Sequence, residues 1–162
     1  MKTVYLSLGS NIGDRAANLA RGIEALAARG VRVTRQSSLY ETEPVELREQ
    51  AWFLNCVVEA ETDLMPIQLM HALLAIEREL GRLRRVVKGP RLIDMDILLF
   101  GTSVVRMAEL EIPHPRMVER RFVLVPFVEI APAVRHPILR KTIAELLAKT
   151  PDRSEVRRWS RA

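Results

Sequence analysis

The segment from Gly89 to Phe100 constrains the fold most, because it places two acidic residues inside an apolar run. It reads Gly-Pro-Arg-Leu-Ile-Asp-Met-Asp-Ile-Leu-Leu-Phe. Side chains alternate along a β-strand. One face would be wholly apolar and is predicted to pack on the core, with Ile93, Met95, Ile97 and Leu99. The other face would carry Leu92, Asp94, Asp96, Leu98 and Phe100. The sequence therefore predicts a buried strand whose two carboxylates point the same way, about 6.5–7 Å apart.

Two aspartates in the middle of a strand need a compensating partner. Asp is depleted in strands, and a buried charge is costly unless it is paired. Mg²⁺ is such a partner, since proteins hold it by one or two carboxylates together with substrate phosphates. Basic residues that bind phosphate precede the strand: Arg78, Arg82, Arg84, Arg85, Lys88 and Arg91. The pattern predicts a metal-dependent polyphosphate site. The alternative is a structural one, in which Asp94 and Asp96 pair with these arginines on a solvated sheet face.

Composition bounds the class of protein. The 162 residues, 48% hydrophobic, predict a single domain over residues 1–162. A net charge of +5 favours an anionic partner. The single cysteine, Cys56, excludes an internal disulfide and is interpreted as a core thiol in a reducing compartment. No apolar run approaches the roughly 20 residues of a membrane span. Because no signal peptide is evident either, we expect a cytoplasmic monomer without a membrane partner.

The remaining patterns predict an α+β fold. Strands are expected at 3–8, 31–40, 52–60 and 92–100, and helices at 15–29, after an Asp14 N-cap, and at 66–80. This β-α-β-β-α-β order is that of a ferredoxin-like antiparallel sheet with its helices on one face. C-terminal additions follow: a short strand near 103–107, an apolar segment 122–130 that is either strand or helix, and a helix at 141–149. The tail from Pro151 is expected to be frayed or a solvated strand.

The uncovered face of this sheet is the predicted binding surface. Phe53 and Asn55 would share it with Asp94 and Asp96. A ring that stacks and an amide that donates and accepts suit a flat heteroaromatic ligand. The alternative is structural: an aromatic packed beneath a loop, and an asparagine bonded to the backbone. Structural alternatives also hold for Glu77 and His114, as a solvated helix carboxylate and a hydrogen-bonded loop histidine.

At this point the residues resemble a known family. Its motifs recur over nearly the whole chain, as Leu8-Gly9-Ser10-Asn11, Ser38 to Pro44, Phe53-Leu54-Asn55, Gly81-Arg82-Leu83-Arg84, Gly89 to Ile97, Pro113-His114-Pro115-Arg116 and Arg120-Arg121-Phe122. Together they resemble the 6-hydroxymethyl-7,8-dihydropterin pyrophosphokinases of folate biosynthesis. Two positions depart from some members: Lys88 stands where an aromatic occurs, and Leu74 where a glutamine occurs.

The resemblance implies a reaction and a set of residue roles. Pyrophosphate would pass from ATP to the hydroxymethyl group of the pterin, with release of AMP. Two Mg²⁺ ions would be held by Asp94 and Asp96. The catalytic residues would be Arg82, Arg91, Asp94 and Asp96. The ATP-binding residues would be Glu77, Arg82, Arg84, Arg91, Ile97, His114 and Arg120. The pterin-binding residues would be Thr42, Pro44, Val45, Phe53, Asn55 and Phe122.

Two rival functions fit parts of the pattern. A basic ferredoxin-like sheet can bind RNA by stacking bases on strand aromatics. Here the binding face carries carboxylates and aromatics are only 5% of the chain, which argues against nucleic acid. A different phosphotransferase with the same carboxylate pair would release ADP instead of AMP, so product analysis separates the two.

Overall fold

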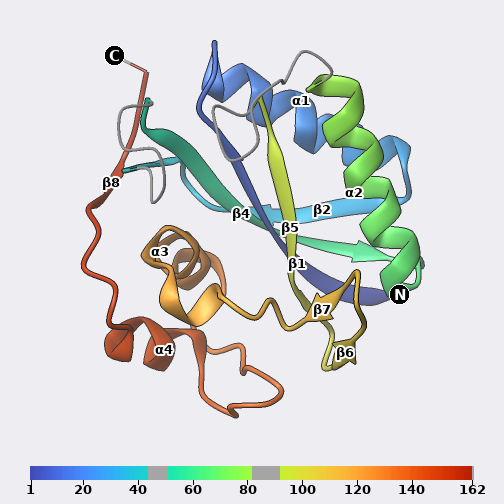
Figure 1. The fold of residues 1–162 in the computed structure, drawn as a ribbon, viewed down its shortest axis with the longest axis vertical. Helices are drawn as coiled ribbons and strands as arrows, with labels where there is room; N and C mark the ends of the chain where they lie inside the picture. The colour runs from blue at the N-terminus through green and yellow to red at the C-terminus, as the bar shows by residue number, and fades with distance from the viewer. Residues whose placement is uncertain (44–50, 82–91, 162) are drawn as a thin grey trace.

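The computed structural model describes residues 1–43, 51–81 and 92–161. The elements follow one another as shown in Figure 1. In chain order they are β1 (Lys2–Ser10), α1 (Arg15–Ala28), β2 (Val31–Gln36), β3 (Tyr40–Thr42), β4 (Phe53–Thr62), α2 (Pro66–Leu80), β5 (Asp94–Phe100), β6 (Val105–Arg106), β7 (Glu111–Ile112), a 3₁₀ turn at Met117–Glu119, α3 (Arg121–Ile130), α4 (Ile143–Lys149) and β8 (Val156–Arg158). As predicted, Asp14 caps α1, accepting a hydrogen bond from the Ala17 N–H.

The main sheet is antiparallel, with strand order β5-β1-β4-β3-β8. The ferredoxin-like prediction is confirmed, but the strand expected at 31–40 is two strands. β2 pairs with the far end of β4 and β3 with its start, at Val31↔Thr62 and Tyr40↔Asn55. Between them the hydroxyl of Ser37 accepts the hydrogen bond of the Val57 N–H at 3.0 Å. A side-chain oxygen here takes the place of a ladder carbonyl, which interrupts the strand.

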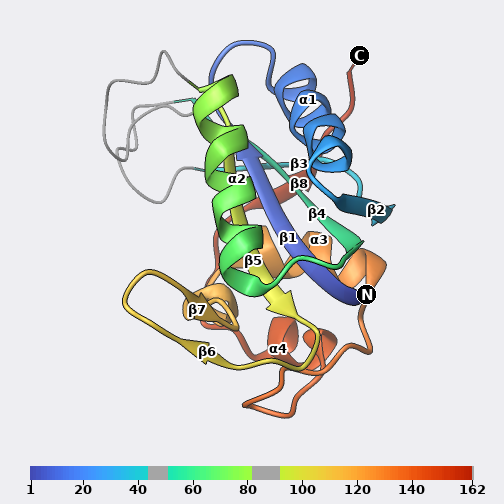
Figure 2. The ribbon, with the colours of Figure 1, turned by 90° about the vertical axis from the view of Figure 1, so that its right-hand side faces the viewer.

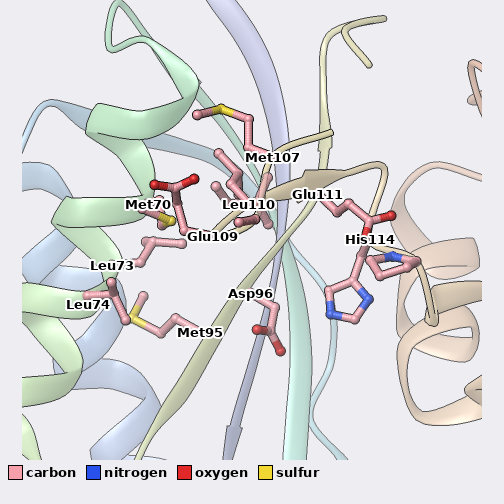
Figure 3. A pocket seen from close by; sticks show the side chains of 13 residues that line it. Met70, Leu73, Leu74, Met95, Asp96, Met107, Glu109, Leu110, Glu111 and His114 are labelled. Carbon is pink, nitrogen blue, oxygen red and sulfur yellow. The ribbon is translucent and has the colours of Figure 1, made fainter. Parts of the chain in front are cut away.

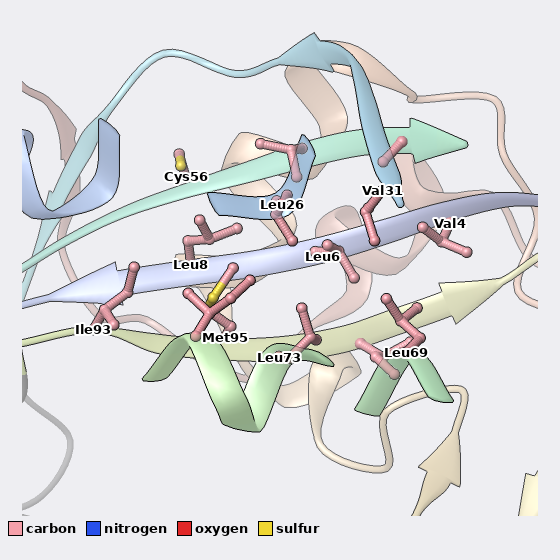
Figure 4. Packing of buried hydrophobic residues seen from close by; sticks show 14 of the residues in the cluster. Val4, Leu6, Leu8, Leu26, Val31, Cys56, Leu69, Leu73, Ile93 and Met95 are labelled. Atoms are coloured by element: carbon pink, nitrogen blue, oxygen red, sulfur yellow. The ribbon is translucent and has the colours of Figure 1, made fainter. Parts of the chain in front are cut away.

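One face of the sheet is covered by α1 and α2, as Figure 2 shows. The buried side chains between these layers form one cluster, part of which is drawn in Figure 4. It includes Val4, Leu6 and Leu8 of β1, Leu19 and Leu26 of α1, and Leu69, Leu73 and Ile76 of α2. Each fully buried leucine contributes about 2 kcal/mol to folding. These helices therefore hold β1 and β5 in a fixed position.

The other face is partly covered by the C-terminal additions. Here α3 and α4 pack on a second cluster that includes Tyr5, Val57, Leu99, Val123 and Phe127. The segment 122–130, left open between strand and helix, is helical, with Pro126 inside α3. The end of this face that carries Gly9 and Asn55 lies outside the second cluster.

The strict alternation expected along β5 is wrong at its end. Register shifts between Tyr5 and Leu6 of β1, which pair with Leu99 and Ile97, so that the bulge falls on Leu98. An extra residue in one strand reverses the facing of those beyond it. Leu99 accordingly packs toward α3 in the second cluster, and Phe100 packs with Ile97 in the first. Asp94 and Asp96 precede the bulge and keep their predicted relation.

The C-terminal tail also pairs with the sheet. Of the two alternatives predicted for the tail, the solvated strand is confirmed: Val156–Arg158 pairs with β3 as the edge strand β8. Among the described residues, none of the helices combines the length and the apolar character that a membrane span requires.

Candidate active site

The two aspartates of β5 lie opposite small residues of β1. Asp94 pairs with Gly9 and Asp96 with Ser7, while Gly9 pairs on its other side with Asn55 of β4. Directly opposed residues of antiparallel strands project to the same face. Asn55, Gly9 and Asp94 therefore form a row across three strands. Asp94 is half-buried and Asp96 is exposed.

Next to this row lies a buried polar pair, Thr42 of β3 and Asn55 of β4. Asn55 is buried, and its Nδ2 donates a hydrogen bond of 2.7 Å to Oγ1 of Thr42. Phe53 pairs with Thr42 and is half-buried. A Cβ on Gly9 would lie 2.6 Å from Oδ1 of Asn55, well inside contact distance. Glycine at position 9 therefore lets the Asn55 amide lie over the sheet. The hydrogen bond to a side chain also departs from the structural alternative of a backbone-bound asparagine.

A pocket of about 340 Å³ opens at the β5 edge of the sheet. Figure 3 shows α2 on one side, with Met70, Leu73 and Leu74, and the β6–β7 hairpin above. The lining also includes Met95, Asp96, Ile97, Glu109, Leu110, Glu111 and His114. The apolar lining residues are joined by four that carry polar or charged groups: Asp96, Glu109, Glu111 and His114. Such a pocket suits a ligand that has a flat, largely apolar part and a charged end, with the charged end on the side of Asp96.

His114 is held rigidly at this pocket. Its backbone N–H donates to the carbonyl of Leu98 at 3.0 Å, and its Nδ1 accepts from the Arg116 N–H at 3.2 Å. Because Nδ1 accepts, the neutral ring carries its proton on Nε2. Burial, and then the positive charges of Arg120 and Arg116, lower the pKa of His114 to about 4. Near pH 7 it is therefore a neutral hydrogen-bond donor.

Glu77 reaches the strand that carries the aspartates. Its Oε2 accepts a hydrogen bond of 2.6 Å from the N–H of Met95, the residue between Asp94 and Asp96. β5 is the edge strand of the sheet, so one side of it has no neighbouring strand in the described sheet. The bond from Met95 to Glu77 therefore ties this strand, with Asp94 and Asp96, to the last full turn of α2. The solvated carboxylate expected as the structural alternative is therefore wrong for Glu77. Its predicted contact with ATP stays a prediction.

Arg120 and Phe122 stand at the start of α3. The guanidinium carbon of Arg120 lies 5.4 Å from the centroid of the Phe122 ring. Such stacking restrains both side chains. The positive charge of Arg120 also lowers the pKa of His114, a residue that lines the pocket.

Several predicted residues fall outside the described part of the chain. These are Pro44, Val45, Arg82, Arg84 and Arg91. Conversely, the β6–β7 hairpin supplies pocket residues that the sequence did not single out, among them Met107 and Leu110. The sequence predicted the first strand of this hairpin near 103–107 but did not indicate that the hairpin borders a pocket. Cys56 is fully buried and burial raises its pKa to about 12, as expected of a core thiol.

The arrangement of these residues defines a class of site. Two carboxylates of one strand beside a pocket lined by a neutral histidine are typical of metal-dependent phosphoryl transfer. The chain matches the family model of 7,8-dihydro-6-hydroxymethylpterin-pyrophosphokinase over residues 5–132. It belongs to this family, as its motifs predicted.

Individual relatives agree with this assignment. The chain is 47% identical over 150 residues to 2-amino-4-hydroxy-6-hydroxymethyldihydropteridine pyrophosphokinase of Methylorubrum extorquens, covering 92% of this chain and 94% of the relative. It is 41% identical over 151 residues to folic acid synthesis protein fol1 of Pneumocystis carinii, covering 93% of this chain. The chain spans only 20% of the length of that fungal relative.

A solved structure shares the fold. The HPPK-DHPS protein of Plasmodium falciparum, crystallised with pteroate, superposes with a TM-score of 0.74 at 17% identity. The match covers 91% of this chain and 42% of that one. At this identity the likeness concerns the fold alone.

Proposed function

We propose that the chain transfers pyrophosphate from ATP to the hydroxymethyl group of 6-hydroxymethyl-7,8-dihydropterin and releases AMP, as a step of folate biosynthesis. The observation that carries the proposal is the position of the β5 carboxylates. Asp94 shares a row with Asn55 of the Thr42–Asn55 pair, and Asp96 lines the pocket at the β5 edge. A substrate bound beside Asn55 and a substrate bound in the pocket would meet at the two carboxylates.

The residues around Asn55 suit a pterin. The amide of Asn55 can donate to and accept from the edge of a pyrimidine-like ring, while the aromatic rings of Phe53 and Phe122 would stack on its faces. Thr42 holds the amide through its 2.7 Å hydrogen bond and so fixes which way it points. Backbone groups of Pro44 and Val45 complete the proposed pterin-binding set.

The pocket suits the nucleotide. Its apolar residues, including Ile97, would receive adenine, and the side with Asp96 and His114 would receive the triphosphate. His114 can donate from Nε2 to a phosphate oxygen without first taking up a proton, and Arg120 adds positive charge. Glu77 would act on this side by holding β5 in register. The proposed nucleotide set also includes Arg82, Arg84 and Arg91.

The donor set fits a hard divalent cation. Asp94 and Asp96 offer carboxylate oxygens at a half-buried and an exposed position, which leaves room for phosphate and water oxygens as further ligands. We infer that they hold two Mg²⁺ ions, which when bound would neutralise the triphosphate and orient it. The new bond joins the pterin hydroxymethyl oxygen to the β-phosphorus, and the bond from the β-phosphorus to the oxygen of AMP breaks.

The proton of the attacking hydroxyl needs only a weak acceptor. A carboxylate or water can take it, since phosphoryl transfer depends mainly on positioning and charge neutralisation. Arg82 and Arg91 are the proposed stabilisers of charge on the transferred group.

The decisive experiment measures nucleotide release by the purified chain. ATP, Mg²⁺ and 6-hydroxymethyl-7,8-dihydropterin should together yield AMP, and omission of the pterin or the metal should abolish it. ADP as the product would instead indicate a simple kinase. We further propose that residues 1–162 act as one domain and as a cytoplasmic monomer, which size-exclusion chromatography with light scattering and cell fractionation would test.

A further inference from the structure

The C-terminal tail lies between two elements that carry proposed substrate contacts. In Figure 1 it leaves α4, passes α3 and ends in β8. On one side β8 pairs with β3, with Val156 opposite Thr42, the residue bonded to Asn55. On the other side residues 152–154 contact the first residue of α3. The tail therefore spans from one wall of the proposed pterin site to the other.

The contact with α3 is made by Asp152. Its Oδ2 accepts a hydrogen bond of 2.7 Å from the backbone N–H of Arg121, and its Oδ1 accepts one of 2.9 Å from the Ser154 N–H. The side chain of Arg121 in turn donates from Nε to the Ser154 carbonyl at 3.1 Å. Arg121 is thus held through both its backbone and its side chain.

The carboxylate of Asp152 caps the N-terminus of α3, although it lies in a distant part of the chain. The first N–H groups of a helix lack partners within it, and a side chain just before the helix normally accepts one of them. In α3 that position is Arg120, whose side chain makes no capping bond. Asp152 supplies the missing acceptor, and its negative charge also suits a helix N-terminus.

The residue that Asp152 holds stands between two proposed substrate contacts. Arg120 precedes Arg121 on the nucleotide side, and Phe122 follows it on the pterin side. Their side chains also contact each other, at 5.4 Å from the guanidinium carbon to the ring centroid. A shift of the Arg121 backbone would move both.

We infer that Asp152 is a positioning residue for the reaction, which holds the start of α3 so that Arg120 and Phe122 face their substrates together. The inference rests on the proposed function. It assigns a task to a tail that contributes no residue to the proposed substrate-binding or metal-binding sets.

The test compares substitutions at position 152 in the full chain. Asp152→Ala removes the acceptor and should lower kcat/KM for the pterin roughly tenfold, less than the ~100-fold that a 1 Å misplacement can cost. The KM for pterin should rise. Asp152→Asn keeps an oxygen that can accept from Arg121, so it should restore most of the activity.

A second helix of the same layer offers the matched control. Thr142 caps α4, its hydroxyl accepting from the Glu145 N–H at 3.1 Å. Thr142→Ala should lower the melting temperature about as much as Asp152→Ala and leave the kinetics unchanged. Should Asp152→Ala not fold, Asp152→Glu replaces it, because it keeps the charge and shifts the carboxylate by one methylene. Its kcat/KM for pterin should fall at least threefold.

The outcomes separate the two proposals. An active wild-type chain together with a folded, fully active Asp152→Ala, or Asp152→Glu in its place, would overturn the positioning role alone. Equal kinetic losses in Thr142→Ala and Asp152→Ala would also overturn it, by reducing it to general destabilisation. A wild-type chain that forms no AMP would overturn the proposed function and the positioning role with it.

Discussion

Replacing Gly9 by alanine should damage pterin binding while leaving the fold in place. The added methyl carbon would lie 2.6 Å from Oδ1 of Asn55, and ordinary contact begins at 3.4 Å, so the oxygen must move by 3.4 − 2.6, or about 0.8 Å. Asn55 is buried and bonded to Thr42 at 2.7 Å, so the amide has little freedom to move without losing its orientation. The same methyl would lie 3.5 Å from Cδ1 of Phe53, an ordinary contact.

The cost follows from what a buried amide contributes to binding. Breaking a hydrogen bond between protein and ligand in a desolvated site costs about 2 kcal/mol, or roughly 30-fold in affinity. We expect Gly9→Ala to raise the Kd for pterin by that factor, measured by calorimetry with a non-hydrolysable ATP analogue present, while the affinity for the analogue alone stays unchanged.

Gly30→Ala is the control for general destabilisation. Gly30 has φ +82° and no heavy atom within 4 Å of the added carbon, so alanine strains the backbone there without touching Asn55. It should cost about 1 kcal/mol of stability and no pterin affinity. Wild-type pterin affinity in a folded Gly9→Ala variant would refute the assignment of Asn55 to the pterin edge.

Three further predictions concern the carboxylates and His114. Asp96→Ala should abolish AMP formation and weaken Mg²⁺-dependent nucleotide binding, measured by calorimetry with and without Mg²⁺; wild-type-like turnover would exclude the metal role. The pKa of His114 is lowered to about 4 from an ordinary 6.5, so on acidification the unfolded chain takes up this proton first, and stability falls from about pH 6.5 to about pH 4. The free energy of unfolding, measured in urea at pH 7 and at pH 4.5, should therefore fall by roughly 2 kcal/mol less in His114→Gln than in the wild type. The same fall in both proteins would contradict the burial of the His114 ring as the cause of this pH dependence. Glu129→Ala should lower the free energy of unfolding by about 2 kcal/mol in the same assay. Glu129 of α3 accepts hydrogen bonds from the backbone N–H and the hydroxyl of Ser38 and from the Tyr40 hydroxyl. A loss below about 0.5 kcal/mol would show that solvent replaces these bonds.

Much of the fold was predictable because local patterns agree with it. Asp14 begins α1 and Pro66 begins α2 as their residue types indicate, and the period-two pattern places Leu54, Cys56 and Val58 on the helix-covered face. The split of the strand expected at 31–40 was not predictable, because it depends on Ser37 bonding to a distant strand.

In the candidate site, too, some residues could be proposed from the sequence and one contact could not. The Asp-x-Asp pair, Asn55 and His114 were recognisable from residue type and motif. The contact of Glu77 with the Met95 N–H was not, because it depends on how α2 packs against the edge of the sheet.

The sequence by itself determined the family, the ferredoxin-like order of elements and the common facing of Asp94 and Asp96, because these depend on motif and on alternation within one strand. Only the tertiary structure decided where that alternation stops, since the bulge at Leu98 arises from pairing with β1. It also decided that Asp152 reaches Arg121, 31 residues earlier. A chain's local preferences cannot specify contacts between segments that meet only when their shared core is packed.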